Sequence, residues 1–339
     1  MSRIFVHGTG AVSPAGWGVG SMMEALRIDR CPVASEVPRP NGGEPLRVNR
    51  VPVPSPKPTF LAHPRMRRAS PISQFALGAA MEAVGADVAA IASGAVRLGI
   101  VFCAFTGSVN YSRRFYSEVL KDPAGASPLL FTETVFNAPA SHLATVLGTT
   151  ACTYTLVGDD GEFIQALALA AEWLTEHRVD ACLVVGAEES DWLTAEALRI
   201  FSPDRRAAEG SAALYLRRES SPIELAAVSD PFLYLHSRTR AQAAAQLAAS
   251  FESARSEDAL LCDGLTGSLN DSDERVAWER WSGRRVSVRR ILGEGFAASG
   301  GWQSLAAVES IRNSSAQRAV VSVVGANLQA VGAEFRRNP

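Results

Sequence analysis

The sequence predicts an α/β fold with two covered β-sheets, and three observations support this. Short apolar runs typical of buried strands alternate with helical patterns, which favours mainly parallel sheets covered on both faces. The 339 residues are 47% apolar and 20% charged, enough to bury a large core. Residues 1–220 and 221–339 show a similar order of elements, which indicates an internal duplication and five layers, α-β-α-β-α.

Residues 1–220 are expected to form the first half. It opens with a short strand at 4–7, a glycine-rich turn and a helix at 21–28 capped by Ser21. The segment 29–66 is expected to be irregular, because residues 32–64 hold nine of the eighteen prolines. A helix capped by Ser70 follows. The remaining patterns predict strands at 96–105, 152–158, 180–188 and 211–218, and helices at 108–121, 138–148 and 161–178.

Residues 221–339 are expected to form the second half and to repeat this order more briefly. The patterns predict strands at 223–230 and 259–264, helices at 238–253, 274–281 and 299–312, and a closing hairpin at 319–335.

Composition excludes several classes of protein. The net charge of −2 argues against a nucleic-acid partner or a basic membrane-surface protein. The five cysteines are scattered without a CxxC pair, which excludes a disulfide scaffold and a cysteine-based zinc site. No apolar run reaches the length of a membrane span, and no charged leader precedes one, so we expect a cytoplasmic protein. The cysteines are Cys31, Cys103, Cys152, Cys182 and Cys262.

Motifs along nearly the whole chain resemble those of the β-ketoacyl-[acyl carrier protein] synthase family of the thiolase superfamily. The order and spacing of these motifs carry the resemblance, which implies a thiolase-like fold with duplicated βαβαβαββ halves. The matching strings are HGTGAVSPAGWGV, RMRRASPISQFALGAAMEAV, SPLLFTETVFNAPASHLATVLG, EFIQALALAAEWLTEHRVDACLVVGAEE, AAEGSAALYL, CDGLTGSLNDSDE and RRILGEGFAASGGWQSLAAV.

The family's catalytic triad is missing from these motifs. The resemblance implies a cysteine nucleophile at a helix N-terminus and two histidines that polarise the substrate carbonyl. Matched without gaps between residues 137 and 188, the nucleophile position falls on Asp160. The histidine positions fall on Asp263 and Glu294, and the family lysine position falls on Arg289. The resemblance therefore implies a degenerate member, similar to a chain length factor. The histidines present, His7, His63, His142, His177 and His236, lie outside the motifs.

Cys152, in the string TTACT, is the alternative nucleophile. If Cys152 were the nucleophile, eight residues would have to be inserted before the helix relative to the family, and the thiol would lie at the start of a strand. We therefore expect Cys152 to be a buried structural thiol.

The three acids at the triad positions allow more than one interpretation. If the fold is kept they converge on one pocket, where Arg289 or backbone N–H groups near Gly161 would offset their charge. They could perform acid/base chemistry, or hold a hard cation such as Mg²⁺ or Ca²⁺. Structural roles are favoured, with Asp159 and Asp160 as helix caps. We therefore expect no metal and no cofactor.

Two further segments depart from the family. Its glycine-rich gating loop is reduced to VVSVVGAN, in which Val323 falls at the gate while Gly325 and Asn327 are retained. The segment 189–208 is much shorter than the family segment that carries part of the acyl pocket's lid. Acyl-chain binding is therefore in question.

The leading hypothesis is a catalytically degenerate ketosynthase-like subunit of a fatty-acid or polyketide-type pathway. It would pair with an active ketosynthase or with itself, and the resemblance makes strand 152–158 the candidate dimer edge. One alternative is an acyl-thioester enzyme that uses Asp160, Asp263 and Glu294. Another is a scaffold that docks an acyl carrier protein through arginines at 65, 67 and 68.

Overall fold

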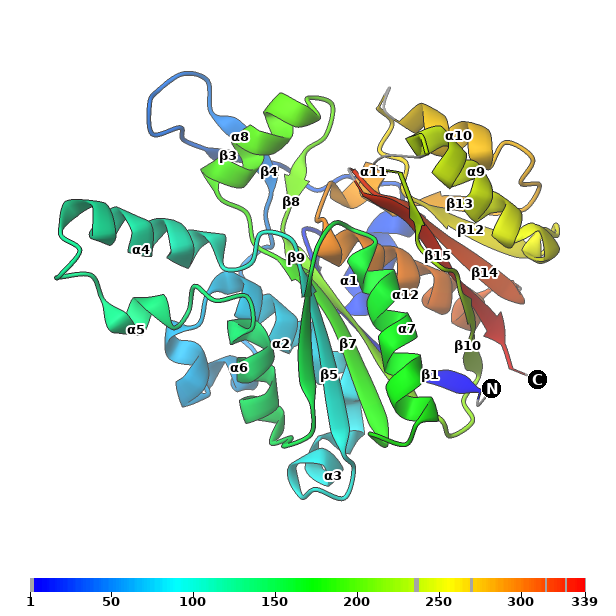
Figure 1. Ribbon diagram of the computed structural model, residues 1–339, viewed down its shortest axis with the longest axis horizontal. Coiled ribbons are helices and arrows are strands. Elements are labelled where there is room, and N and C mark those ends of the chain that lie inside the picture. The colour runs from blue at the N-terminus through cyan, green and yellow to red at the C-terminus, as the bar shows by residue number, and fades with distance from the viewer. Residues whose placement is uncertain (1–2, 235–237, 269–270, 315, 327, 339) are drawn as a thin grey trace.

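Two five-stranded units of the same strand order form the centre of the protein (Figure 1). The computed structural model describes residues 3–234, 238–268, 271–314, 316–326 and 328–338. The first unit has the order β1-β9-β7-β5-β6 and the second β10-β15-β14-β12-β13. The first comprises β1 (Ile4–Ser13), β5 (Leu98–Ala104), β6 (Thr153–Val157), β7 (Ala181–Glu188) and β9 (Gly210–Arg217). The second comprises β10 (Ile223–Val228), β12 (Ala259–Asp263), β13 (Arg284–Ser287), β14 (Arg318–Val324) and β15 (Gln329–Arg337).

Strand directions match between the two units, which confirms the internal duplication. In the first, β5 is parallel to β6 and β7, while β9 is antiparallel to β7 and β1. In the second, β12 is parallel to β13 and β14, while β15 is antiparallel to β14 and β10. The sheets are therefore evenly mixed, and the expectation of mainly parallel sheets was wrong. Strands β1 and β10 join the units, and residue 220, the expected boundary, lies between β9 and β10.

Helices cover both units in the predicted five layers. Helices α7 and α12 lie between the two units, and α12 contacts strands of both. Helices α2 and α6 cover the outer face of the first unit, and α9 covers the second with α10 packed beside it. The bounds are α2 (Pro71–Val84), α6 (Ala138–Leu147), α7 (Glu162–Thr175), α9 (Arg240–Ser250), α10 (Ser272–Ala277) and α12 (Ala297–Asn313).

The glycines near the N-terminus serve helix packing rather than a turn. Strand β1 runs on to Ser13, so the predicted strand at 4–7 was too short. A Cβ at Gly8 would lie 1.8 Å from the carbonyl oxygen of Ala83, and one at Gly10 would lie 1.9 Å from that of Ala79. Both carbonyls belong to α2, so the two glycines allow this helix to lie directly on the strand.

Two predicted helix caps were wrong, and one helix of the structure was not predicted. Helix α1 (Val19–Arg27) begins before Ser21, whose hydroxyl donates to the Trp17 carbonyl instead of capping the helix. Ser70 occupies the N-cap position of α2, but its hydroxyl donates to Glu189. Helix α8 (Trp192–Phe201), capped by Asp191, lies in a segment for which no element was predicted.

The remaining elements are short or lie at the periphery. The proline-rich segment is mostly irregular, as predicted, and β3 (Ser35–Val37) and β4 (Leu46–Asn49) form a small sheet with β8 (Ala207–Ala208). Helices α4 (Val109–Lys121) and α5 (Pro128–Phe131) project from the body (Figure 1). The other elements are β2 (Gly16–Trp17), β11 (Phe232–Leu233), α3 (Val88–Ala92), α11 (Val288–Leu292) and the 3-10 turns Thr59–Ala62, Pro64–Arg68, Gly85–Asp87 and Glu252–Ala254.

By length and composition, the stretch Pro71–Ala92 is apolar enough to cross a membrane. Half of it is buried inside the protein, and its main part, α2, packs against β1, β9 and β7. The apolar character of α2 therefore follows from its place in the core.

Candidate functional site

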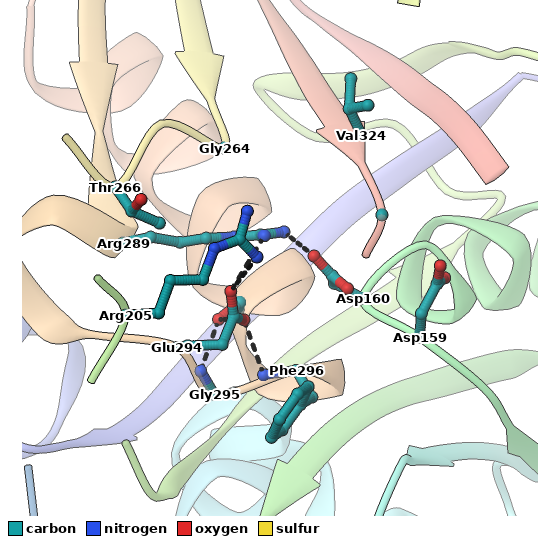
Figure 2. Close-up of polar contacts among 12 residues, drawn as sticks. Asp159, Asp160, Arg205, Gly264, Thr266, Arg289, Glu294, Gly295, Phe296 and Val324 are labelled. Atoms are coloured by element: carbon teal, nitrogen blue, oxygen red, sulfur yellow. Dashed lines mark hydrogen bonds and ion pairs between the residues drawn. The ribbon is translucent and has the colours of Figure 1, made fainter. Parts of the chain in front are cut away.

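Asp160 lies where β6 turns into the buried helix α7, which is the predicted nucleophile position. The neighbouring Asp159 shapes this turn, because its Oδ1 accepts a hydrogen bond of 3.0 Å from the backbone N–H of Gly161. Burial and the charge of Asp160 raise the pKa of Asp159 to about 7. The two side chains diverge, with Asp160 directed toward Arg289 (Figure 2). The prediction that these aspartates cap the helix was therefore wrong, because Gly161 is the N-cap of α7 and no side chain caps it.

Arg289 is the centre of a buried ion cluster (Figure 2). Its guanidinium is fully buried and forms ion pairs with Asp160 and, at 3.3 Å, with Glu294. Its Nε also donates to Gln303 at 3.3 Å. Burial alone would lower the pKa of Arg289, but the charges of Asp160 and Glu294 raise it. Arg289 thus pairs with the residues at both the predicted nucleophile position and the predicted second histidine position.

Glu294 is held rigidly in the loop between α11 and α12. Its carboxylate accepts hydrogen bonds from Arg205 at 3.1 Å and from the Ser299 hydroxyl at 3.2 Å. The backbone N–H of Phe296, a residue with a positive φ of 43°, donates to it at 3.1 Å. The side chains of both Arg205 and Glu294 are at least 95% buried. Glu294 therefore cannot swing toward a substrate without breaking several bonds.

Asp263 lies at the end of β12 and takes part in a second acidic pair. It accepts hydrogen bonds from the Ser287 hydroxyl at 2.6 Å and from the backbone N–H of Leu265 at 3.3 Å. The fully buried Glu274 lies close by and accepts from the Ser322 hydroxyl at 2.5 Å. Burial, reinforced by the charge of Asp263, raises the pKa of Glu274 to about 7. Burial also raises the pKa of Asp263.

The structure brings together only part of the predicted acid cluster. Asp160 and Glu294 share Arg289, but no ion pair joins Asp263 to that arginine among the described residues. Nor do the described ranges contain a group of three or more His, Cys, Asp or Glu side chains that could hold a metal ion. A guanidinium lies between two of the proposed ligands, which argues against the alternative of a hard-cation site.

The described part of the gating-loop remnant comprises β14 and the residues directly after it. Val323 is buried in β14 opposite Val331, and Asn327 lies outside the described residues. The Gly325 carbonyl accepts hydrogen bonds from the Tyr234 hydroxyl at 2.6 Å and from Arg240 Nε at 3.1 Å. A Cβ at Gly325 would lie 2.1 Å from Asp159 Oδ2, so the turn also packs against the start of α7.

Cys152 is exposed and precedes β6, so its expected burial was wrong. Cys103, Cys182 and Cys262 are buried in β5, β7 and β12. Burial raises the pKa of the Cys262 thiol, which lies next to Asp263. Cys152 thus lies away from the helix start where the family nucleophile belongs.

The three arginines considered for carrier-protein docking lie on the 3-10 turn Pro64–Arg68. All three residues are exposed. Arg65 Nε donates to His142 Nδ1 at 3.1 Å, and His142 also contacts Glu133. Arg65 is therefore tied to the body of the protein, whereas Arg67 and Arg68 remain at the surface.

Strand β6, the predicted dimer edge, lies at the end of its sheet. Tyr154 and Val157 are 53% and 51% exposed on this strand. Large apolar side chains are also exposed on the projecting α4–α5 arm, including Leu120 and Leu129. An edge strand with exposed apolar side chains is suited to pairing with another chain.

Two buried charged residues around the predicted positions escaped the sequence analysis. Arg205 binds Glu294 across 89 positions of the chain, and no local pattern links the two residues. Glu274 is the last residue of the string CDGLTGSLNDSDE, and its resemblance to the family glutamate was the available signal.

The duplicated five-layer architecture, with Asp160 at the start of the central buried helix, is the thiolase-like fold of the β-ketoacyl synthases. The structure of the ishigamide ketosynthase/chain length factor matches with a TM-score of 0.83 and 18% identity, covering 99% of this chain and 100% of that one. A β-ketoacyl synthase from Burkholderia phymatum matches at 0.79 and 16% identity, covering all of both chains. A ketosynthase in complex with its chain length factor from Xenorhabdus doucetiae matches at 0.77 and 16%, covering 99% and 98%. No protein-family model and no curated protein matches the sequence.

Proposed function

We propose that this chain is a cytoplasmic, catalytically degenerate member of the ketosynthase family that pairs with an active ketosynthase and supports acyl-chain elongation. The observation that carries the proposal is the ion pairing of Arg289 with both Asp160 and Glu294. Two of the three positions that perform condensation in the family are occupied by buried carboxylates, whose charges are offset by Arg289 and Arg205.

The chemistry of the site supports a role without condensation. A carboxylate that attacks a thioester gives an acyl anhydride, which hydrolyses readily and cannot replace a thioester intermediate. Asp160 is 1% exposed and Glu294 is 2% exposed, so neither offers a free carboxylate to a substrate. The same burial argues against the alternative of a reassigned acyl-thioester enzyme.

The edge strand β6 supports the pairing. Its main-chain groups on the outer side of the sheet face away from β5, and Tyr154 and Val157 add exposed apolar area. The α4–α5 arm lies on the same side of the sheet (Figure 1). The proposed contact is the equivalent edge strand of an active ketosynthase, arranged about a pseudo-twofold axis. Two of the matched structures contain a ketosynthase together with a chain length factor, and this pairing motivates the choice of partner.

Co-expression with a ketosynthase from the same gene neighbourhood tests the proposal. The pair should co-purify, and malonyl-dependent condensation should disappear when the partner's cysteine is replaced. Val157→Arg should break the pair, because it places a charge in the proposed contact. Val276→Arg is the matched control, since Val276 is 69% exposed on the distant α10.

Four outcomes would contradict the proposal. Robust condensation by this chain alone, abolished by Asp160→Asn, would show a reassigned catalyst. Loss of pairing in the Val276 variant but not the Val157 variant would refute the contact through β6. Binding of an acyl carrier protein without any ketosynthase would favour the scaffold alternative, and self-association without a partner would favour a homodimer.

A further inference from the structure

A small pocket adjoins the ion cluster, since Arg205, Arg289 and Glu294 form part of its wall. It has a volume of about 200 Å³, and the rest of its wall comes from the segment after α1, the end of β4, the loop after β12, α11 and the loop before β8. Four arginines line it, namely Arg205, Arg206, Arg289 and Arg290, against two carboxylates. Since one water occupies about 30 Å³ of liquid, the pocket has room for roughly six waters or a ligand of similar size.

The arginines differ in how far their donors are already used. Arg289 is committed to Asp160 and Glu294, and Arg290 pairs with Asp29 at the surface. Arg205 uses one nitrogen on Glu294, but its buried Nε has no hydrogen-bond partner among the described residues. Arg206 is exposed at the pocket and has no ion pair in the described part of the chain. The donors open to a ligand are therefore those of Arg205 and Arg206.

Asn49 adds an unused acceptor to the same pocket. Its Nδ2 donates to the Leu292 carbonyl at 2.8 Å, which fixes the orientation of the amide. Its Oδ1 is buried and has no partner within the described ranges. Buried polar atoms are rarely left without a partner, and those lining a cavity indicate what a ligand would supply.

We propose that this pocket binds a small oxyanion that also carries an O–H group, namely hydrogenphosphate or a hydroxycarboxylate. The anionic oxygen would accept from Arg205 Nε and the Arg206 guanidinium, which are the charge-assisted bonds that arginine forms best. The O–H would donate to Asn49 Oδ1. Binding at this pocket does not depend on pairing with a ketosynthase, so the two proposals are tested separately.

Cys31 provides a reporter within the pocket. Its side chain lines the wall, it is exposed, and its Sγ donates to the Arg290 carbonyl at 3.6 Å. Cys152 is exposed elsewhere and serves as an internal control, while the other three cysteines are buried. Alkylation by iodoacetamide, followed peptide by peptide by mass spectrometry, gives the labelling rate of both exposed thiols in one sample.

The full chain is labelled in phosphate, sulfate, lactate or propionate, with ionic strength held constant by sodium chloride. Phosphate or lactate should slow labelling of Cys31 in a saturable way and leave Cys152 unchanged. Sulfate and propionate lack the O–H at neutral pH, so their half-saturating concentrations should be about fivefold higher. Protection by phosphate alone identifies a phosphate-type ligand, and protection by lactate alone identifies a carboxylate-type ligand.

Arg206→Ala should raise the half-saturating concentration about tenfold, because a charge-assisted hydrogen bond is lost. Arg68→Ala removes another exposed arginine and should have no effect. The proposal is overturned if no anion protects Cys31, if Cys31 and Cys152 slow equally, or if the Arg206 and Arg68 variants behave alike.

Discussion

Removing the charge of Arg289 should destabilise the protein more than any surface substitution. Arg289→Gln leaves Asp160 without its only ion-pair partner among the described residues, while Glu294 keeps Arg205. Breaking a buried pair by removing one partner costs about 3–5 kcal/mol, because the remaining charge is buried without compensation. Asp160 is 1% exposed, so we expect a loss of about 4 kcal/mol in the free energy of unfolding.

Equilibrium unfolding in urea, followed by circular dichroism, measures this loss. Arg290→Gln is the matched control, since the neighbouring arginine forms an exposed pair with Asp29 and should cost less than about 1 kcal/mol. The double variant Arg289→Gln/Asp160→Asn removes both charges of the broken pair and should recover about 1–3 kcal/mol relative to additivity. A loss below about 1 kcal/mol for Arg289→Gln, or additive effects in the double variant, would refute the reasoning.

Three further outcomes are expected. Burial and the charge of Asp263 raise the pKa of Glu274 from 4.5 to about 7, so its contribution to stability is complete below the unfolded pKa and is lost as pH rises through about 7. The free energy of unfolding should therefore fall from pH 4.5 to 7 by on the order of 2 kcal/mol more in the wild type than in Glu274→Gln. Urea titration at each pH measures both curves, and an equal or smaller fall in the wild type than in the variant contradicts the assignment. Gly10→Ala should lower the free energy of unfolding by about 3 kcal/mol or prevent folding, because the new Cβ would lie 1.9 Å from a backbone oxygen of α2. Gly20→Ala is the control, since its new Cβ meets open space and the variant should melt at the wild-type temperature. Incubation with an acyl-loaded carrier protein should leave no acyl group on this chain in intact-mass spectra, and a stable acyl adduct on Cys152 would contradict the placement of the nucleophile position.

Most of the fold could be predicted because the strands and helices carry strong local patterns. The run around β7 is apolar and bounded by polar residues, and the pattern of α7 has the helical period. The extent of β1 was missed because glycines at positions 8 and 10 look like turn residues. Only the close approach of α2, seventy residues later in the chain, explains them.

The site was predictable in position but not in its interactions. The motif spacing placed Asp160 and Glu294, and the structure joins both of them to Arg289. The role of Arg205 depends on a contact between distant segments, and the separate environment of Asp263 depends on Ser287 from a neighbouring strand. Such pairings follow from tertiary packing, so a single sequence does not reveal them.

The ion cluster also restricts how this chain can change. A cysteine at position 160 alone would leave Arg289 only Glu294, which it shares with Arg205. A histidine at position 294 alone would remove the carboxylate that pairs with Arg205. Each single step toward a family triad therefore disturbs a charge balance that several residues maintain together. A substitution at position 160 or 294 alone is therefore expected to lower the free energy of unfolding, because the buried charges are balanced as a group.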